Sequence, residues 1–371
     1  MVHFEQLVHY MCGRLNESFE GRNENLKLDT TDLKLLEAIY GFQNLKTSDI
    51  AEKTGLSEIT VKRRLRNLRK RGLFAKKYAV NYWKVKLIPL MVVGRNLWGK
   101  VDQAILDSFC RSVRTVMTSV SYHILDLIVP ADDLGNILEY FSGSFKDVDM
   151  YFLKSFHKSV SFRFYDVVKN AWKIDYLALS LYIREIIVKE GYIDILKQTS
   201  PIKTIIEKVP SRPIKLSGKY ARKIRNFETF LNRKNSFLDS NMGISKYTVY
   251  KIKSELKRAN VLKTYIDVYP PKLVEKLYLI IEKGDMRFLE ALLLGLSELP
   301  VLSFYKANKL DASGKFVKEN VIIARLELPE GGLVGFLESF TKMLIDKTDF
   351  KLCLETKVLT PHEKGGEEIA R

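Results

Sequence analysis

The chain has 371 residues, a formal net charge of +17 at pH 7 and a hydrophobic fraction of 46%. Its length is that of two or more domains, and its 20 Phe and 18 Tyr residues can fill several cores, which excludes global disorder. Apolar runs such as 87–94 are shorter than the roughly 20 residues of a membrane span, no signal peptide is evident, and three scattered cysteines indicate a reducing cytoplasm.

The basic excess is concentrated in two segments. Residues 46–84 carry 12 basic and 3 acidic residues, and residues 212–275 carry 15 basic and 5 acidic residues, so the rest of the chain is nearly neutral. The two segments are related, because Gly55-Leu56-Ser57 recurs 188 positions later as Gly243-Ile244-Ser245. Such a constant offset predicts an internal repeat, and two localised basic elements favour a nucleic-acid partner over a merely solvated surface.

The first basic segment predicts a helix-turn-helix. Thr30 or Thr31 can cap a helix that runs to Tyr40, and a short second helix over 49–54 is expected to begin after Thr47 or Ser48. Gly55 permits the tight turn that follows. An additional helix is expected within residues 1–25, where it could pack on the domain or swap between copies.

A third, basic helix is expected from the Ser57 cap to Arg71, and residues 73–80 are expected to form a hairpin wing. Val61, Leu65 and Leu68 share one face of this helix, so the opposite face points outward, as a recognition helix in a major groove requires. The alternative is an amphipathic surface helix with no DNA contact. The candidate DNA-binding residues are Ser57, Glu58, Ile59, Thr60, Lys62, Arg63, Arg66, Arg69, Lys70 and, at the tip of the wing, Lys76 and Lys77.

These residues resemble the N-terminal winged helix of the leucine-responsive regulatory protein (Lrp/AsnC) family. The resemblance implies that a βαββαβ effector and dimerisation domain of ferredoxin-like topology follows, and the periodicity independently predicts strands and helices in that order over 88–94, 98–113, 116–129, 130–145 and 148–160. The matching positions are Leu28-Asp29, Asp32, Leu36, Asp49-Ile50-Ala51, Gly55-Leu56-Ser57, Val61, Arg64-Leu65, Leu68 and Gly72-Leu73.

The segment from Ile174 to Val188 is apolar on almost every side, which predicts a buried helix. Packing in the core or between domains is one interpretation, and a dimerisation helix is the other. The second basic segment then repeats the helix-turn-helix less regularly, with Asp239 in place of Ala51 and Lys253 in place of Leu65. Its candidate DNA-binding residues, for which packing against a neighbouring domain is the alternative, are Lys246, Tyr247, Tyr250 and Lys251.

The pattern after the second segment again predicts strand, helix, two strands, helix and strand, between 277 and 357. The expected fold class is therefore α+β, with two tandem repeats of a winged helix-turn-helix followed by a ferredoxin-like βαββαβ domain, and the source is expected to be archaeal. The expected domains are an N-terminal helix (1–25), winged helix 1 (26–84), ferredoxin-like domain 1 (85–165), a helical connector (166–211), a degenerate winged helix 2 (212–272), ferredoxin-like domain 2 (273–360) and a tail (361–371).

The chain departs from the family at the turn that binds amino acids. Where family members carry a Gly-x-Tyr-Asp turn, this chain has 123–126 and retains only Asp126, and the second half, 322–325, retains nothing. Amino-acid sensing is therefore not expected.

No phosphate-binding glycine loop or metal-ligand spacing is present, so no catalytic, metal or cofactor residue is predicted. His123 and His157, expected on adjacent strands, leave a siroheme-decarboxylase-like enzyme as an alternative to structural histidines.

The favoured function is a sequence-specific, double-stranded DNA-binding transcription regulator in which one chain mimics an Lrp-type dimer. The protein is expected to be cytoplasmic and nucleoid-associated, with no enzyme activity, cofactor or membrane contact. If it forms a homodimer, the ferredoxin-like sheets or the helical connector are the expected interfaces. A small-molecule effector stays open. A plasmid or viral replication initiator with tandem winged helices is a further alternative.

Overall fold

The computed structural model describes residues 26–40, 46–118, 120–189, 191–208 and 246–359. The predicted N-terminal helix, the first part of the second helix-turn-helix and the C-terminal tail lie outside the described residues. No helix within the described part is long and apolar enough to cross a bilayer.

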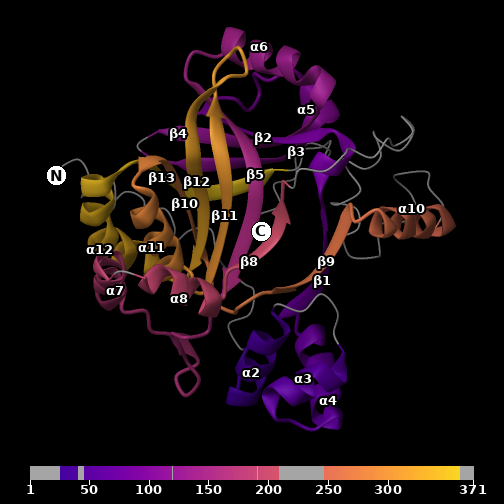
Figure 1. Ribbon diagram of the computed structural model, residues 1–371, viewed down its shortest axis with the longest axis vertical. Helices are drawn as coiled ribbons and strands as arrows, with labels where there is room; N and C mark the ends of the chain where they lie inside the picture. The colour runs from indigo at the N-terminus through magenta and orange to yellow at the C-terminus, as the bar shows by residue number, and fades with distance from the viewer. Residues whose placement is uncertain (1–25, 41–45, 119, 190, 209–245, 360–371) are drawn as a thin grey trace.

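Three helices form the unit at the N-terminal end of the described chain, below the sheet in Figure 1: α2 (Thr30–Ile39), α3 (Thr47–Thr54) and α4 (Glu58–Lys70). The predicted cap of the first helix is wrong, because Asp29, one residue earlier, accepts a hydrogen bond from the backbone N–H of Asp32 at 2.8 Å. The second helix begins at Thr47, directly after Lys46, without a side-chain cap. Two predictions are confirmed: Gly55 adopts the left-handed conformation at φ 70°, and Ser57 caps α4.

The predicted hairpin wing does not form. Residues after α4 make a single strand, β1 (Phe74–Val80), whose partner is β9 (Leu262–Val268) from the second half of the chain. The two strands are antiparallel over seven residue pairs. In the predicted hairpin, residues 73–80 would turn back and pair with one another. Instead, β9 supplies the backbone pairing of β1, and Lys76 and Lys77 lie in the middle of a strand.

Eight long strands form one closed antiparallel barrel. In the first half the spatial order is β3-β4-β2-β5, and in the second half it is β11-β12-β10-β13; the pairs β13–β3 and β11–β5 join the halves and close the ring. The expectation of two separate ferredoxin-like domains is therefore corrected to a single eight-stranded barrel. The strands are β2 (Leu87–Arg95), β3 (Cys110–Met117), β4 (Ser121–Pro130), β5 (Val148–Val160), β10 (Glu275–Gly284), β11 (Val301–Leu310), β12 (Phe316–Leu328) and β13 (Thr348–Leu359).

Apolar side chains from all eight strands fill the barrel. Because neighbouring residues of a strand point to opposite faces, Met91 and Val93 of β2 lie in this inner cluster while Leu90 and Val92 lie in an outer one. The inner cluster contains Met91, Val93, Val116, Ile124, Tyr151, Leu153, Tyr278, Ile280, Ala307, Val321, Ile323 and Cys353.

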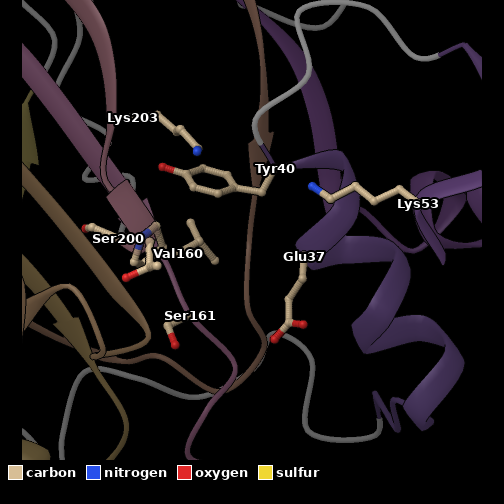
Figure 2. A pocket seen from close by; sticks show the side chains of 9 residues that line it. Glu37, Tyr40, Lys53, Val160, Ser161, Ser200 and Lys203 are labelled. Carbon is tan, nitrogen blue, oxygen red and sulfur yellow. The ribbon is translucent and has the colours of Figure 1, made fainter. Parts of the chain in front are cut away.

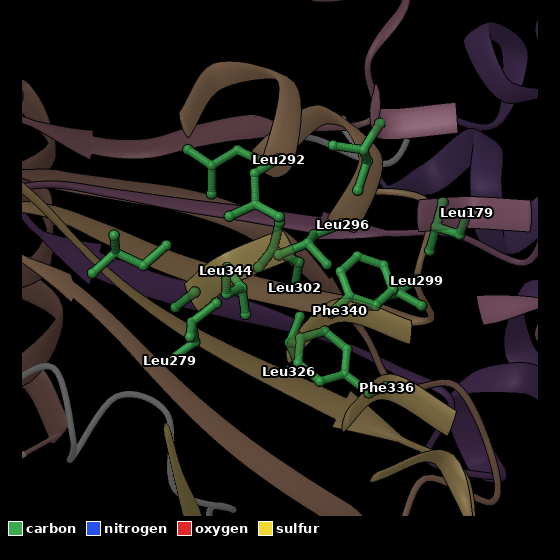
Figure 3. Packing of buried hydrophobic residues seen from close by; sticks show 14 of the residues in the cluster. Leu179, Leu279, Leu292, Leu296, Leu299, Leu302, Leu326, Phe336, Phe340 and Leu344 are labelled. Carbon is green, nitrogen blue, oxygen red and sulfur yellow. The ribbon is translucent and has the colours of Figure 1, made fainter. Parts of the chain in front are cut away.

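Helices cover the outer face of each half. The first half carries α5 (Gln103–Phe109) and α6 (Leu134–Ser144), and the second half carries α11 (Met286–Leu296) and α12 (Gly332–Lys347). Figure 3 shows leucine and phenylalanine side chains of α11 and α12 packed over the strands of the second half. The helix predicted over 98–113 is shorter than expected, because from Cys110 onward alternating apolar residues pair as strand β3.

Two buried ion networks are built from strand residues of the barrel. In one, Glu355 of β13 lies 3.1 Å from the Arg325 guanidinium and 3.9 Å from that of Arg114, which also binds Asp126. In the other, Glu282 accepts hydrogen bonds from Tyr151 at 2.6 Å and Lys309 at 2.9 Å. Burial raises the pKa of Glu282, but Lys318, Tyr151 and Lys309 outweigh it and hold the pKa at about 2. Each network joins residues of the two halves of the barrel.

The segment between the halves differs from the prediction. Its main helix, α7 (Tyr176–Val188), packs on α11 and α12 through Leu179, Ile183 and Ile186, but Leu177, Leu181 and Val188 are exposed. The expectation of a helix buried on every side is therefore wrong: one face packs and the other faces solvent. The shorter elements are η1 (Tyr82–Val85), η2 (Ala131–Asp133), β6 (Tyr165–Asp166), β7 (Ala171–Trp172), α8 (Tyr192–Thr199), β8 (Lys203–Glu207), which pairs with β5, and α10 (Lys246–Arg258).

Candidate nucleic-acid interface

The third helix of the N-terminal unit, α4, is anchored on one side and exposed on the other. Val61, Leu65 and Leu68 are buried against α2 and α3. Ser57 Oγ accepts the backbone N–H of Thr60 at 3.3 Å, which fixes where the helix begins. Ser57 itself is exposed and Thr60 is half-buried. The remaining candidates of α4 are exposed, namely Glu58, Ile59, Lys62, Arg63, Arg66, Arg69 and Lys70.

Two arginines, Arg64 within the predicted recognition helix and Arg71 at its end, have a structural role that the pattern did not reveal. The Arg64 guanidinium lies 2.6 Å from Asp29 and 3.2 Å from Asp32, and Arg71 lies 3.3 Å from Asp32. Burial raises the pKa of Asp29, but the Asp32 N–H and the Arg64 guanidinium outweigh it and lower the pKa. These ion pairs tie α4 to the start of α2.

Unlike Arg64 and Arg71, the cations on the outward face of α4 have no carboxylate partner among the described residues. Among the described residues none forms an ion pair with Lys62, Arg63, Arg66, Arg69 or Lys70. Exposed cations that no described carboxylate pairs with are available to phosphates and base edges. Asn67, four residues after Arg63, is also exposed on α4 and was missed because it lies between the buried Leu65 and Leu68. Its amide can pair with adenine.

The two lysines of β1 lie in different surroundings. Lys76 is exposed. Lys77 is half-buried, its Nζ lies 6.0 Å from the centre of the Tyr269 ring, and burial lowers its pKa although Asp267 raises it. Lys76 is therefore the lysine of this pair that can reach a phosphate.

Only the last helix of the second unit, α10, is described. Lys246, Tyr247 and Tyr250 lie in its first turns, where side chains are not described, and Lys251 is exposed. Lys253, which stands where the first unit has a buried leucine, has its Nζ 4.1 Å from the centre of the Tyr78 ring of β1 and donates to the Tyr78 hydroxyl. Lys253 thus links α10 to β1, the strand that follows α4.

The N-terminal unit is fastened to the barrel by buried polar contacts. Tyr40 at the end of α2 donates its hydroxyl hydrogen to the carbonyl oxygen of Lys158 in β5. The Lys158 ammonium in turn forms a buried ion pair with Asp267 of β9. Val160 and Val301 at the barrel end belong to the same apolar cluster as α2 and α4. These contacts fix the orientation of α2, and with it that of α4, relative to the barrel.

A pocket of about 380 Å³ lies where this unit meets the barrel. Figure 2 shows its wall built from three parts of the chain. Glu37, Tyr40 and Lys53 come from α2, its C-terminal cap and α3; Val160 and Ser161 from the end of β5; and Ser200 and Lys203 from the turn after α8 and the start of β8. Burial raises the pKa of Glu37, and Lys53 opposes that shift. The pocket is mostly polar and lies between the N-terminal helices and the segment that connects α8 to β8.

The two histidines considered for an enzyme do not lie on adjacent strands. His123 is in β4 and His157 in β5, and β2 runs between them. His157 is buried, stacks on Phe304 with ring centres 4.7 Å apart and contacts Ser155 Oγ at 2.7 Å. Burial lowers its pKa to about 4, and Lys306 adds to that shift. Within the described ranges, no three His, Cys, Asp or Glu side chains group as metal ligands would.

Comparison with known proteins gives a family match for the first unit. Residues 28–74 match a family described as winged helix-turn-helix DNA-binding. The chain therefore contains a winged helix-turn-helix DNA-binding domain at its N-terminal end. No curated protein matches the sequence.

Solved structures with related folds share little sequence with this chain. The siroheme decarboxylase NirDL is 11% identical, with 89% of this chain and 92% of that chain covered and a TM-score of 0.41. The same protein in complex with an iron-uroporphyrin III analogue covers 88% and 90% at a TM-score of 0.40 and 11% identity. PH0061 is 17% identical over 34% of this chain and 93% of its own, with a TM-score of 0.27.

These neighbours correct one expectation. The sequence-based view that the chain has no enzyme activity is contradicted by the two NirDL structures, since both are of an enzyme. At 11% identity they assign no reaction or substrate to this chain.

Proposed function

We propose that the protein is a sequence-specific double-stranded DNA-binding regulator and that α4 enters the major groove. One observation carries the proposal: α4 is locked to α2 by its apolar stripe and by Arg64, while five cations on its other face are exposed and form no ion pair with any described residue. In a helix-turn-helix the second helix of the motif contacts base edges through its N-terminal residues. Arg63 is the candidate for a bidentate bond to guanine, and Arg66, Arg69 and Lys70 for phosphates.

A second DNA-contacting helix is proposed for α10, with Lys246, Tyr247, Tyr250 and Lys251 at the interface. Because β1 and β9 are antiparallel and each follows its helix directly, α4 and α10 leave the ribbon from opposite ends (Figure 1). Seven residue pairs span roughly 20 Å. With half a helix added at each end, the two helices can reach successive major grooves on one face of DNA, about 34 Å apart.

We also propose that the chain is a tandem duplication that places an Lrp-type pair of modules in one polypeptide. The support is the symmetry of the pairing. Lys77 lies opposite Tyr265, and these positions are 188 residues apart, the offset of the sequence repeat. Both halves of the barrel also have the element order βαββαβ and the same strand order. A second copy of the chain is then not needed to present two DNA-binding helices.

The experiment that tests DNA reading is selection of duplexes from a random pool, followed by affinity measurements with single variants. Arg63→Ala should weaken the selected site by roughly 1–3 kcal/mol and remove discrimination at one base pair. Arg184→Ala, which removes an exposed arginine from α7, is the matched control and should leave the affinity unchanged. Equal loss on all duplexes for Arg63→Ala would contradict its role as a base reader.

Mapping of bound sites on the chromosome separates a transcription regulator from a replication initiator. Sites upstream of transcription units support the regulator, and they would place the protein on the nucleoid. Sites confined to an origin of replication support the initiator.

A further inference from the structure

The first turn of α4 carries an isoleucine whose side chain is largely exposed. Ile59 is 82% exposed, whereas the apolar residues that anchor the same helix, Val61 and Leu68, are completely buried. It belongs to none of the apolar clusters of the described residues. Single exposed apolar residues are common on protein surfaces, so exposure alone assigns no role. Its position on the helix does.

Ile59 follows the N-cap by two residues and lies on the outward face. The N-terminal residues of a recognition helix are those that contact base edges. Around Ile59 the outward face is polar or cationic: Glu58 precedes it and Lys62 and Arg63 follow. When this face of α4 lies against DNA, Ile59 meets the same base edges as its neighbours, and its apolar side chain gains most from an apolar group there. In the major groove the only apolar group on a base edge is the C5-methyl of thymine.

We propose that Ile59 is a specificity-determining residue that contacts the C5-methyl group of a thymine in the half-site bound by α4. The inference rests on the proposed function and deepens it, because it names a base that this helix selects. Ile59 and Arg63 are four residues apart and are therefore neighbours along the helix surface. The Cβ atoms of such a pair are roughly 5–6 Å apart. That spacing is one to two base steps of B-DNA, so the thymine lies within two base pairs of the guanine that Arg63 binds.

The test uses the full chain and a duplex selected from a random pool, resynthesised with deoxyuridine in place of each thymine in turn. Uracil lacks only the C5-methyl, so the substitution removes the proposed contact and nothing else on the base edge. For the wild-type chain, one position in the half-site of α4 should lose about fourfold in affinity, the effect of one buried methyl group. Ile59→Ala should bind the thymine and uracil duplexes equally, and Ile59→Val should retain the preference for thymine.

Leu177→Ala is the matched control, because Leu177 is also a largely exposed apolar side chain but lies on α7; it should keep the full uracil effect. Replacing the neighbouring guanine by 7-deazaguanine should weaken wild type and have no effect on Arg63→Ala. Sequence-specific binding with no uracil-sensitive position would overturn the inference and leave the proposed function intact. A uracil effect of equal size in Ile59→Ala would overturn the assignment to Ile59. Failure to enrich any duplex would overturn both proposals.

Discussion

Lys77 of β1 lies directly opposite Tyr265 of β9, at the centre of the ribbon that joins the two basic elements of the chain. In the proposed duplication these two positions are equivalent, which gives the ribbon an approximate twofold axis through this pair. A residue on such an axis contacts its own counterpart. It therefore lies between the two modules, and Lys77 is poorly placed for a phosphate at the outer edge of the molecule.

A first prediction separates the two lysines of β1. Lys76→Ala should flatten the dependence of log affinity on log salt by about one unit, since each phosphate contact contributes that much. Lys77→Ala should leave the salt slope unchanged, because Lys77 is half-buried over Tyr269. Titrations of one duplex at several salt concentrations measure both slopes. A change of one unit for Lys77→Ala would show that its ammonium reaches DNA.

A second prediction concerns the buried ion pair that links β5 to β9. Asp267→Ala should destabilise the protein by about 3–5 kcal/mol, because it leaves the Lys158 ammonium buried without its partner. The double variant Lys158→Met with Asp267→Ala should recover most of that loss, since no buried charge is left unpaired. Denaturant unfolding of the wild type, the two single variants and the double variant gives the coupling energy. If the double variant loses as much free energy of unfolding as the two single variants together, Lys158 and Asp267 do not stabilise each other as proposed.

A third prediction is a pH dependence from His157. Its folded-state pKa of about 4 lies below the ordinary value of 6.5, so the unfolded chain binds a proton more readily. The contribution to stability is therefore fully present above pH 6.5 and is lost as pH falls from 6.5 toward 4. As pH falls from 7 to 5, protonation of His157 in the unfolded chain should lower the free energy of unfolding by about 2 kcal/mol. His157→Gln removes the titration and should show a correspondingly smaller loss in unfolding experiments at the two pH values.

A fourth prediction tests the close approach of α7 to α11. A Cβ added at Gly295 would lie 2.1 Å from Cγ1 of Ile183, too near for any small adjustment. Gly295→Ala should therefore lower the free energy of unfolding by about 1–3 kcal/mol. Ile183→Ala removes the clashing atoms, so the double variant should be more stable than the sum of the two single effects. Gly143→Ala in α6, where no atom lies within 4 Å of the added Cβ, is the control.

The bounds of individual helices and strands could be predicted where they depend only on the residue pattern of that segment. Strand β5 and helix α11 begin and end at the predicted residues, because alternation and 3.6-residue periodicity are properties of the segment itself. The closed barrel was not predictable, because β3 and β5 find their partners β13 and β11 in the other half of the chain. The wing failed for the same reason: nothing near residue 74 indicates that its partner strand is β9.

The candidate site follows the same division. The outward face of α4 could be read from its apolar stripe, and the structure leaves most of those residues exposed. Arg64 and Arg71 could not be separated from their neighbours by sequence, because their role depends on Asp29 and Asp32, which lie 32 to 39 residues earlier in the chain. The unusual Lys253 was visible as an irregularity, but its contact with Tyr78 requires the two halves to be folded together.

The closed ring has a consequence for how the chain is made. On the ribosome the first half emerges with β3 and β5 as open edges, and exposed edge strands are prone to pair with other chains. Their partners β11 and β13 follow roughly 150 to 240 residues later, at a synthesis rate of about 5–20 residues per second. For some ten seconds or more the nascent barrel is therefore half-built, and β13, the last of its strands to be synthesised, completes it.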